Sequence, residues 1–218
     1  NDTTYRVEVT TLVDSSSTTN GLSDFRVIAN MEEGNFVSET TQGYSVDNIH
    51  PATPDNVSAS VSGNDIDISW DYAEDIDFSY YEFNQLSEEP VYILDNVMNT
   101  NIYDTYDEYH VHSVDIHDNY SDESDYVGAH DLHLGANLVG VCVIPEDNSI
   151  GNVVDGNVSG VIGAGFAGSE INGTWVGSLT EIDSASGYWI KADESFVHVT
   201  YGDKKVTEEY DDLHSGNN

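Results

Sequence analysis

Hydrophobic and polar residues alternate along most of the chain, in short runs separated by turn residues. Residues 65–70 are the clearest case, because Ile66, Ile68 and Trp70 fall on one side of the run and polar side chains fall on the other. This spacing is typical of a strand with one buried face. Similar runs begin near Tyr80, Val91, Ile102, Tyr109 and Tyr126. About seven short strands, with no helical period, predict an antiparallel β-sandwich.

One stretch of this pattern occurs twice, starting at Phe25 and again at Tyr109. The paired positions are Phe25 with Tyr109, Val27 with Val111, and Ala29 with Ser113, followed by Asn35-Phe36 with Asn119-Tyr120. Because the first matches fall at every second position, we expect Phe25, Val27 and Ala29 to share one buried strand face. The repeat predicts two domains of one type, of which residues 1–50 contain only the C-terminal half.

Residues 54–128 resemble a fibronectin type III domain. The resemblance rests on Pro54 at the start, Trp70 after the second strand, a tyrosine pair in the third strand, and the ending Y-H-V-H-S-V-D followed by D-N-Y-S-D-E-S. That ending is similar to the Y-x-V-x-A-x-D…G-N-x-S-x-x-S pattern of bacterial members. The chain departs from the family at T-Y-D-E, residues 105–108, where many members have a longer corner rich in Leu, Pro and Gly. The resemblance implies an immunoglobulin-like sandwich with a spacing or binding role.

From residue 131 the composition changes to short β runs between glycines, with fewer acids. Residues 131–206 therefore predict a small β module. Its opening D-L-H-L-G-A-N nearly recurs as D-L-H-S-G-N-N from Asp212, so we interpret residues 207–218 as a linker and the start of a second copy. The opening and the closing G-Y-W-I-K resemble a repeat of large modular surface or secreted proteins of marine bacteria and some phages. The predicted fold class is all-β: an immunoglobulin-like, fibronectin type III antiparallel β-sandwich plus a smaller Gly-rich β module.

The net charge of the chain excludes some classes of binding partner. It has 41 Asp and Glu against 5 Lys and Arg, a formal net charge of -36. Nucleic acid is excluded, because binding it requires a basic surface that displaces counterions from phosphates. The same sign argument excludes anionic membrane surfaces. No basic residue lies between Arg26 and Lys191, so the carboxylates between them must be solvated, screened by salt or bound to cations. Saline surroundings outside the cell are the natural interpretation.

No stretch is long and apolar enough for a signal peptide or a membrane span, so direct membrane insertion is not expected. The chain also starts at Asn1 rather than Met. We expect it to be a piece of a longer precursor.

An oxygen-rich turn is the candidate calcium site. The run D-I-H-D-N-Y-S-D supplies hard ligands in Asp115, Asp118, Asn119 and Asp122. No EF-hand loop is present, and in so acidic a chain such clusters also arise by chance. The alternative is diffuse screening of the surface by cations. No cofactor other than calcium is expected.

Two histidines are candidate zinc ligands. His110 and His112 alternate on one predicted strand and share a face, with Glu108 beside them and His117 near the strand end. The simpler interpretation is that both histidines lie on the solvated face, because Tyr109 and its alternate neighbours take the buried one.

The third region carries the remaining candidates. Trp175, Tyr188 and Trp189 are a candidate carbohydrate-stacking platform, with a core role as the simpler alternative. The motif G-A-G-F-A-G from Gly163 has dinucleotide-binding spacing. However, the glycines that follow it break the helix such a site needs, so we expect a turn between strands. Hydrolase motifs such as G-x-S-x-G and H-E-x-x-H are absent, so an enzyme is not expected.

These features predict a non-catalytic structural or adhesive fragment of a large extracellular or cell-surface modular protein. Its partners would be other domains of the same polypeptide and surface glycans or proteins. Two alternatives stay open: the accessory tail of a secreted hydrolase, and a fibre or decoration protein of a marine phage, which would place the chain in a virion.

Overall fold

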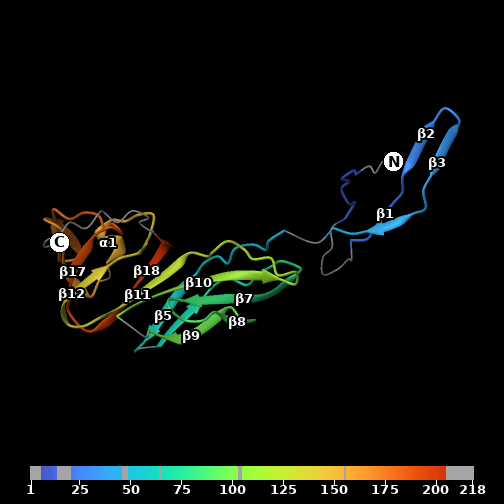
Figure 1. Ribbon diagram of the computed structural model, residues 1–218. Helices are drawn as coiled ribbons and strands as arrows, with labels where there is room; N and C mark the ends of the chain where they lie inside the picture. The colour runs from blue at the N-terminus through green and yellow to red at the C-terminus, as the bar shows by residue number, and fades with distance from the viewer. Residues whose placement is uncertain are drawn as a thin grey trace, which may run out of the picture.

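The computed structural model describes residues 6–13, 21–45, 49–63, 65–102, 105–154 and 156–204. Nearly all regular structure is strand, and the single helix of the described part is the short α1 (Ile150–Val153). The strands form an N-terminal unit of β1–β4, a sandwich of β5–β11 and a C-terminal module of β12–β18 (Figure 1). In this part of the chain no helix is both long and apolar enough to span a bilayer.

The sandwich has two antiparallel sheets. One contains β5 (Ser58–Ser62), β6 (Asp65–Ser69) and β9 (Val97–Asn101), in that order. The other contains β8 (Val91–Ile93), β7 (Phe78–Gln85), β10 (Tyr106–Asp115) and β11 (Tyr126–Leu132). The chain passes from the first sheet to the second, returns for β9, and ends in the second. This alternation is that of an immunoglobulin-like sandwich, so the predicted fold class is confirmed.

Alternation along the strands builds the core between the two sheets. Ile66, Ile68 and Trp70 are buried as predicted, while Asp65 and Asp67 are exposed. The Trp70 ring meets Tyr81 of β7 edge-on at 5.3 Å. The remaining buried members are Phe83, Tyr109, Val111, Val127 and Ala129. Each large apolar side chain removed from water contributes about 1.5–3 kcal/mol, so this core is the main stabilising element of the sandwich.

The N-terminal unit differs from the prediction. β1 (Ser23–Phe25) pairs with β4 (Thr41–Gly43), and β2 (Ile28–Met31) pairs with β3 (Gly34–Val37). The continuous strand expected from Phe25 to Ala29 is interrupted at residues 26–27, and Val27 is 70% exposed. The expectation of one buried face was wrong because alternation buries residues only where a second sheet faces them. Among the described residues, these four strands pair only with one another.

The C-terminal module is a five-stranded antiparallel sheet over a second apolar core. The strand order is β12 (Gly135–Gly140), β17 (Gly187–Ala192), β14 (Val158–Ile162), β15 (Ala167–Ile171) and β16 (Thr174–Gly177). The motif G-A-G-F-A-G forms the turn between β14 and β15, where the Gly163 N–H donates to the Phe166 carbonyl at 2.9 Å. Asn172 and Gly173 both have positive φ in the next hairpin turn, which suits a two-residue connection. Gly163, Gly165 and Gly173 are therefore turn residues, as expected, whereas Gly168 lies in β15.

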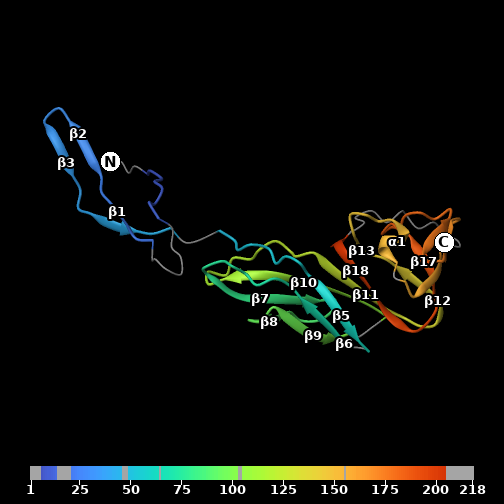
Figure 2. The ribbon, with the colours of Figure 1, turned by 180° about the vertical axis from the view of Figure 1, so that it is seen from behind.

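One long strand joins the module to the sandwich. β18 (Phe196–Lys204) pairs with β11 over seven positions, from Leu132↔Phe196 to Tyr126↔Gly202. Beyond β18 lies β13 (Val143–Ile144), which completes a six-stranded sheet in the order β13-β18-β11-β10-β7-β8. Both views show β18 beside β11 (Figures 1 and 2). The boundary predicted at residues 128–131 falls inside β11, so there is no linker there.

The two faces of this shared sheet belong to different cores. Val197 and Val199 of β18 pack against the sandwich core, beside Val127 and Ala129 of β11. On the opposite face, Leu132 and Phe196 pack into the core of the module. Tyr201 also reaches the other sandwich sheet, where its hydroxyl accepts the Ala59 N–H at 3.2 Å and donates to the Ala59 carbonyl at 3.3 Å.

Gly128 of β11 leaves little room for a side chain on the face of the shared sheet that packs on the module. A Cβ at this position would lie 2.7 Å from Thr200 Oγ1 and 3.1 Å from Val143 Cβ. The Gly128→Ala variant should lose about 1–3 kcal/mol of unfolding free energy, because one added methyl overpacks this junction. Urea denaturation measures the loss.

The matched control is Gly140→Ala, in β12 of the C-terminal module, where a new Cβ meets nothing within 4 Å. It should change stability by no more than about 0.5 kcal/mol. Equal stability of Gly128→Ala and the wild type would contradict the close packing of module on sheet.

Candidate functional site

The predicted calcium turn follows β10 and is organised around Asp115. This residue is 1% exposed, and its Oδ1 accepts the N–H groups of His117 at 2.7 Å and Asn119 at 2.9 Å. Its Oδ2 accepts the side-chain amide of Asn119 at 2.7 Å. Burial alone would raise the pKa of Asp115, but the hydrogen bonds from Asn119 and His117 outweigh it and lower the pKa. Both carboxylate oxygens are thus engaged by the turn itself.

Of the other predicted ligands, Asn119 contacts Asp115, but the carboxylates of Asp118 and Asp122 do not gather around it. Asp118 occupies the left-handed region with φ 62°, and the carboxylates of Asp115, Asp118 and Asp122 do not form a cluster within 4.8 Å. The carboxylate and imidazole ligand atoms that form a cluster with Asp115, all within 4.8 Å of one another, belong to Asp77 and His117. Sequence reasoning missed Asp77 because it precedes β7, which the fold brings beside the end of β10. The oxygen-rich turn is explained by its own hydrogen bonds.

The Asp115→Asn variant should be less stable than the wild type by about 2 kcal/mol at pH 7, because charge-assisted hydrogen bonds to the turn are lost. A carboxyl whose pKa is lowered on folding stabilises the native state above its unfolded pKa, near 3.9. The difference between variant and wild type should therefore shrink as the pH falls below about 4. Urea denaturation at both pH values measures it, and a difference independent of pH would contradict this role.

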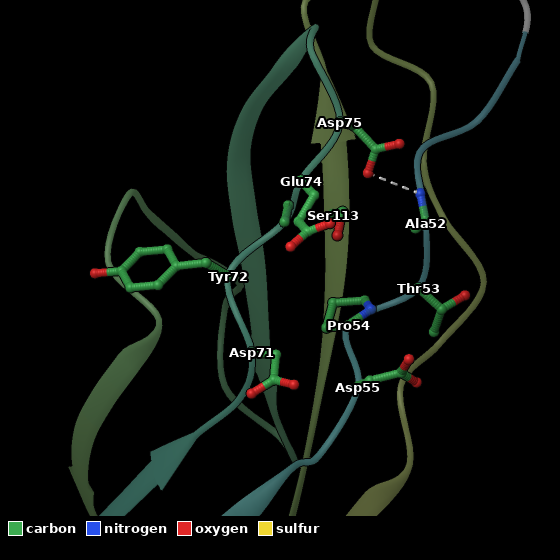
Figure 3. A pocket seen from close by; sticks show the side chains of 10 residues that line it. Ala52, Thr53, Pro54, Asp55, Asp71, Tyr72, Glu74, Asp75 and Ser113 are labelled. Carbon is green, nitrogen blue, oxygen red and sulfur yellow. Dashed lines mark hydrogen bonds between the residues drawn. The ribbon is translucent and has the colours of Figure 1, made fainter.

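A second acidic feature lies at one end of the sandwich. Residues 52–55, before β5, and residues 71–75, after β6, line a cavity of about 540 Å³ (Figure 3). The Ala52 N–H donates to Asp75 Oδ2 at 3.1 Å and ties the two segments together. Four acids line this cavity, with no lysine or arginine among the lining residues: Asp55, Asp71, Glu74 and Asp75. Sequence reasoning did not find it, because the two segments meet only in the folded sandwich.

The histidines predicted to share a face do so, with a different acidic neighbour. The ligand atoms of His110, His112 and Glu123 all lie within 4.8 Å of one another. Glu123 belongs to the loop between β10 and β11, and nothing in the local sequence pattern marks it. The two neighbours suggested by the sequence are occupied elsewhere: His117 lies with Asp77 and Asp115, and Glu108 is part of an ion pair.

That ion pair links the two modules across the shared sheet. The Lys204 ammonium group of β18 contacts the Glu108 carboxylate of β10, whose side chain is 6% exposed. Tyr106 donates its hydroxyl to the other Glu108 oxygen at 3.0 Å, and burial raises the pKa of Tyr106 so that the proton stays in place. Lys204 also lies 5.5 Å from the centre of the Tyr126 ring. One of the few cations of the chain is therefore used at this junction.

The Lys204→Met variant should lose about 3 kcal/mol of unfolding free energy, because Glu108 would be left buried without its counterion. Lys191→Met, at an exposed lysine of the same module, is the matched control and should stay close to the wild type. Combining Lys204→Met with Glu108→Gln should recover part of the loss in chemical denaturation. Independent, additive losses in the double variant would contradict the pairing.

The predicted aromatic platform is not assembled. Tyr188 is 2% exposed, its hydroxyl donates to Asp183 Oδ2 at 3.0 Å, and burial raises its pKa. Trp175 is partly buried against the same core, whereas Trp189 is 50% exposed on the other face of β17. Consecutive strand residues point to opposite faces, so Tyr188 and Trp189 cannot stack on one ligand. Tyr188 has the core role that was the alternative.

Trp189 instead borders a groove between the two modules. This groove, of about 470 Å³, is also lined by Leu138, Tyr106 and His130. His130 Nε2 lies 2.9 Å from the Gly140 carbonyl, which can only accept, so Nε2 carries the proton of the neutral ring. Burial lowers the pKa of His130 and favours that neutral form. Its Nδ1 is buried and has no hydrogen-bond partner among the described residues.

The sequence and the structure of the chain were compared with those of known proteins. No protein-family model matches the chain, and a search of curated proteins finds no match. Among solved structures, the FN1–FN3 domains of chicken CNTN1 are 14% identical, with 84% of this chain and 75% of that chain covered at a TM-score of 0.25. At that TM-score the two chains do not superpose as wholes, so the fold assignment rests on the strand order described above.

Proposed function

We propose that this chain is a non-catalytic spacing and adhesive segment of a large extracellular or cell-surface modular protein. The six-stranded sheet shared by the sandwich and the C-terminal module carries the proposal. Two modules joined by a flexible linker can rotate freely, whereas two modules that share strands move as one body. A spacer needs such a fixed length.

The groove bordered by Trp189 supports the adhesive part of the proposal. An exposed indole beside a concave surface with a few polar groups is a surface on which a sugar ring can stack. Surface glycans or proteins are the partners we propose. Reading the gene upstream of Asn1 separates this role from a hydrolase tail, which would follow a catalytic domain, and from a virion protein, which would have virion genes as neighbours.

The acidity supports a role for cations in this setting. We propose that calcium acts on this surface by screening it, rather than at a site built from Asp115, Asp118, Asn119 and Asp122, because the turn engages both Asp115 oxygens. Screening relieves the mutual repulsion of a surface with a net charge of -36.

Distance measurement between spin labels tests the spacer role. Labels at Glu88→Cys in the sandwich and Ala185→Cys in the module, both exposed positions, should give one narrow distance distribution in a Cys142→Ser background. The control pair, Glu88→Cys with Asp67→Cys, lies within the sandwich and defines the width that label motion alone produces. A distribution for the first pair that is several times broader than the control would contradict a rigid spacer.

A further inference from the structure

Two imidazoles and one carboxylate converge on the outer face of the sandwich. His110 and His112 alternate on β10 and point away from the sandwich core, which receives Tyr109 and Val111. Glu123 reaches the same place from the loop before β11, and the three ligand atoms lie within 4.8 Å of one another. We propose that His110, His112 and Glu123 form a binding site for a divalent transition-metal cation of the zinc class.

A hydrogen bond to the backbone prepares His112 as a ligand. Its Nδ1 lies 3.0 Å from the Ser121 carbonyl oxygen. A carbonyl oxygen can only accept, so Nδ1 carries the proton and Nε2 keeps its lone pair in the neutral ring. A histidine that binds a metal through one ring nitrogen commonly donates the N–H of the other ring nitrogen to a backbone carbonyl. This hydrogen bond fixes both the tautomer and the ring orientation.

Tyr126 supports the other two ligands. Its ring packs on the His110 imidazole with 4.6 Å between ring centres, and its hydroxyl donates to Glu123 Oε2 at 2.6 Å. Burial, followed by the hydrogen bond to Glu123, raises the pKa of Tyr126, so the hydroxyl remains a donor. Glu123 is thus oriented through one oxygen while Oε1 stays available.

The surrounding charges also suit a cation. The cationic neighbour, Lys204, is neutralised by Glu108. Glu82 of β7 stands opposite His112 in the strand register and adds negative charge to the same face. The site therefore lies in a negative field.

The donor set decides which cation fits. Tetrahedral zinc at about 2.0–2.2 Å from nitrogen and oxygen ligands places those ligands about 3.4 Å apart, so the three side chains need to close by a little over 1 Å at most. Exposed Glu123 can turn to do this. Two imidazoles favour zinc over calcium or magnesium, which prefer oxygen ligands. Three protein ligands leave a fourth position for water or a partner's side chain.

Zinc titration of the full 218-residue chain tests the proposal. The titration uses a chromogenic chelator as competitor, with excess magnesium and calcium to occupy the diffuse acidic surface. We expect one tight zinc ion per chain. His112→Ala and Glu123→Gln should each weaken binding at least tenfold, and Co²⁺ should show the visible absorption of a tetrahedral site in the wild type only.

The matched controls are His133→Ala, at an exposed histidine of the C-terminal module, and Glu88→Gln, at an exposed sandwich acid. Both should bind zinc as the wild type does. Thermal melts show whether each variant is folded, and Glu123→Gln keeps the test valid if His112→Ala is not. Zinc binding that is unchanged in Glu123→Gln, or that excess calcium removes, would overturn the site.

Discussion

Pairing between β11 and β18 is the interaction on which the rest of this structure depends. It makes one sheet serve two apolar cores, with Val197 and Val199 facing the sandwich and Leu132 and Phe196 facing the module. Without β18, the backbone edge of β11 would be open and prone to pair with other chains. The pairing therefore supplies stability, covers an edge and fixes the direction of one module relative to the other.

The shared sheet also explains where one of the few positive charges of this acidic chain is placed. Almost all acids of the sandwich lie on solvated faces, where salt can screen them. Glu108 is an exception, because it is buried at the junction and meets Lys204 across the sheet. Scarce positive charge is thus placed where burial makes an uncompensated carboxylate most costly. Apart from Asp107 and Asp115, which are also buried, the remaining acids of the sandwich are at its surface or only partly buried.

The sandwich could be predicted because the hydrophobic pattern within each short segment is enough to identify a strand and its buried face. Alternation at Ile66, Ile68 and Trp70 specifies a strand face directly, and the structure buries all three. The same reasoning failed at Val27, where burial depends on which element lies opposite. Two contacts could not be predicted in this way: the pairing of β11 with β18, and the approach of Glu123 to His112. Each joins segments that are separated along the chain, and the hydrophobic pattern within one segment does not show which other segment it will contact. At the Asp115 turn, backbone N–H groups bond one carboxylate oxygen and the Asn119 side-chain amide bonds the other, a use of these residues that their spacing does not reveal.

Scanning calorimetry of two core variants tests the central claim, that sandwich and module form one cooperative unit. Ile68→Ala opens a cavity in the sandwich core and Ile190→Ala opens one in the module core, while Ile76→Ala, at an exposed position, is the control. The shared sheet predicts a single unfolding transition for both modules, whose midpoint falls with either core substitution. Two separate transitions, each lowered by only one of the two substitutions, would contradict it.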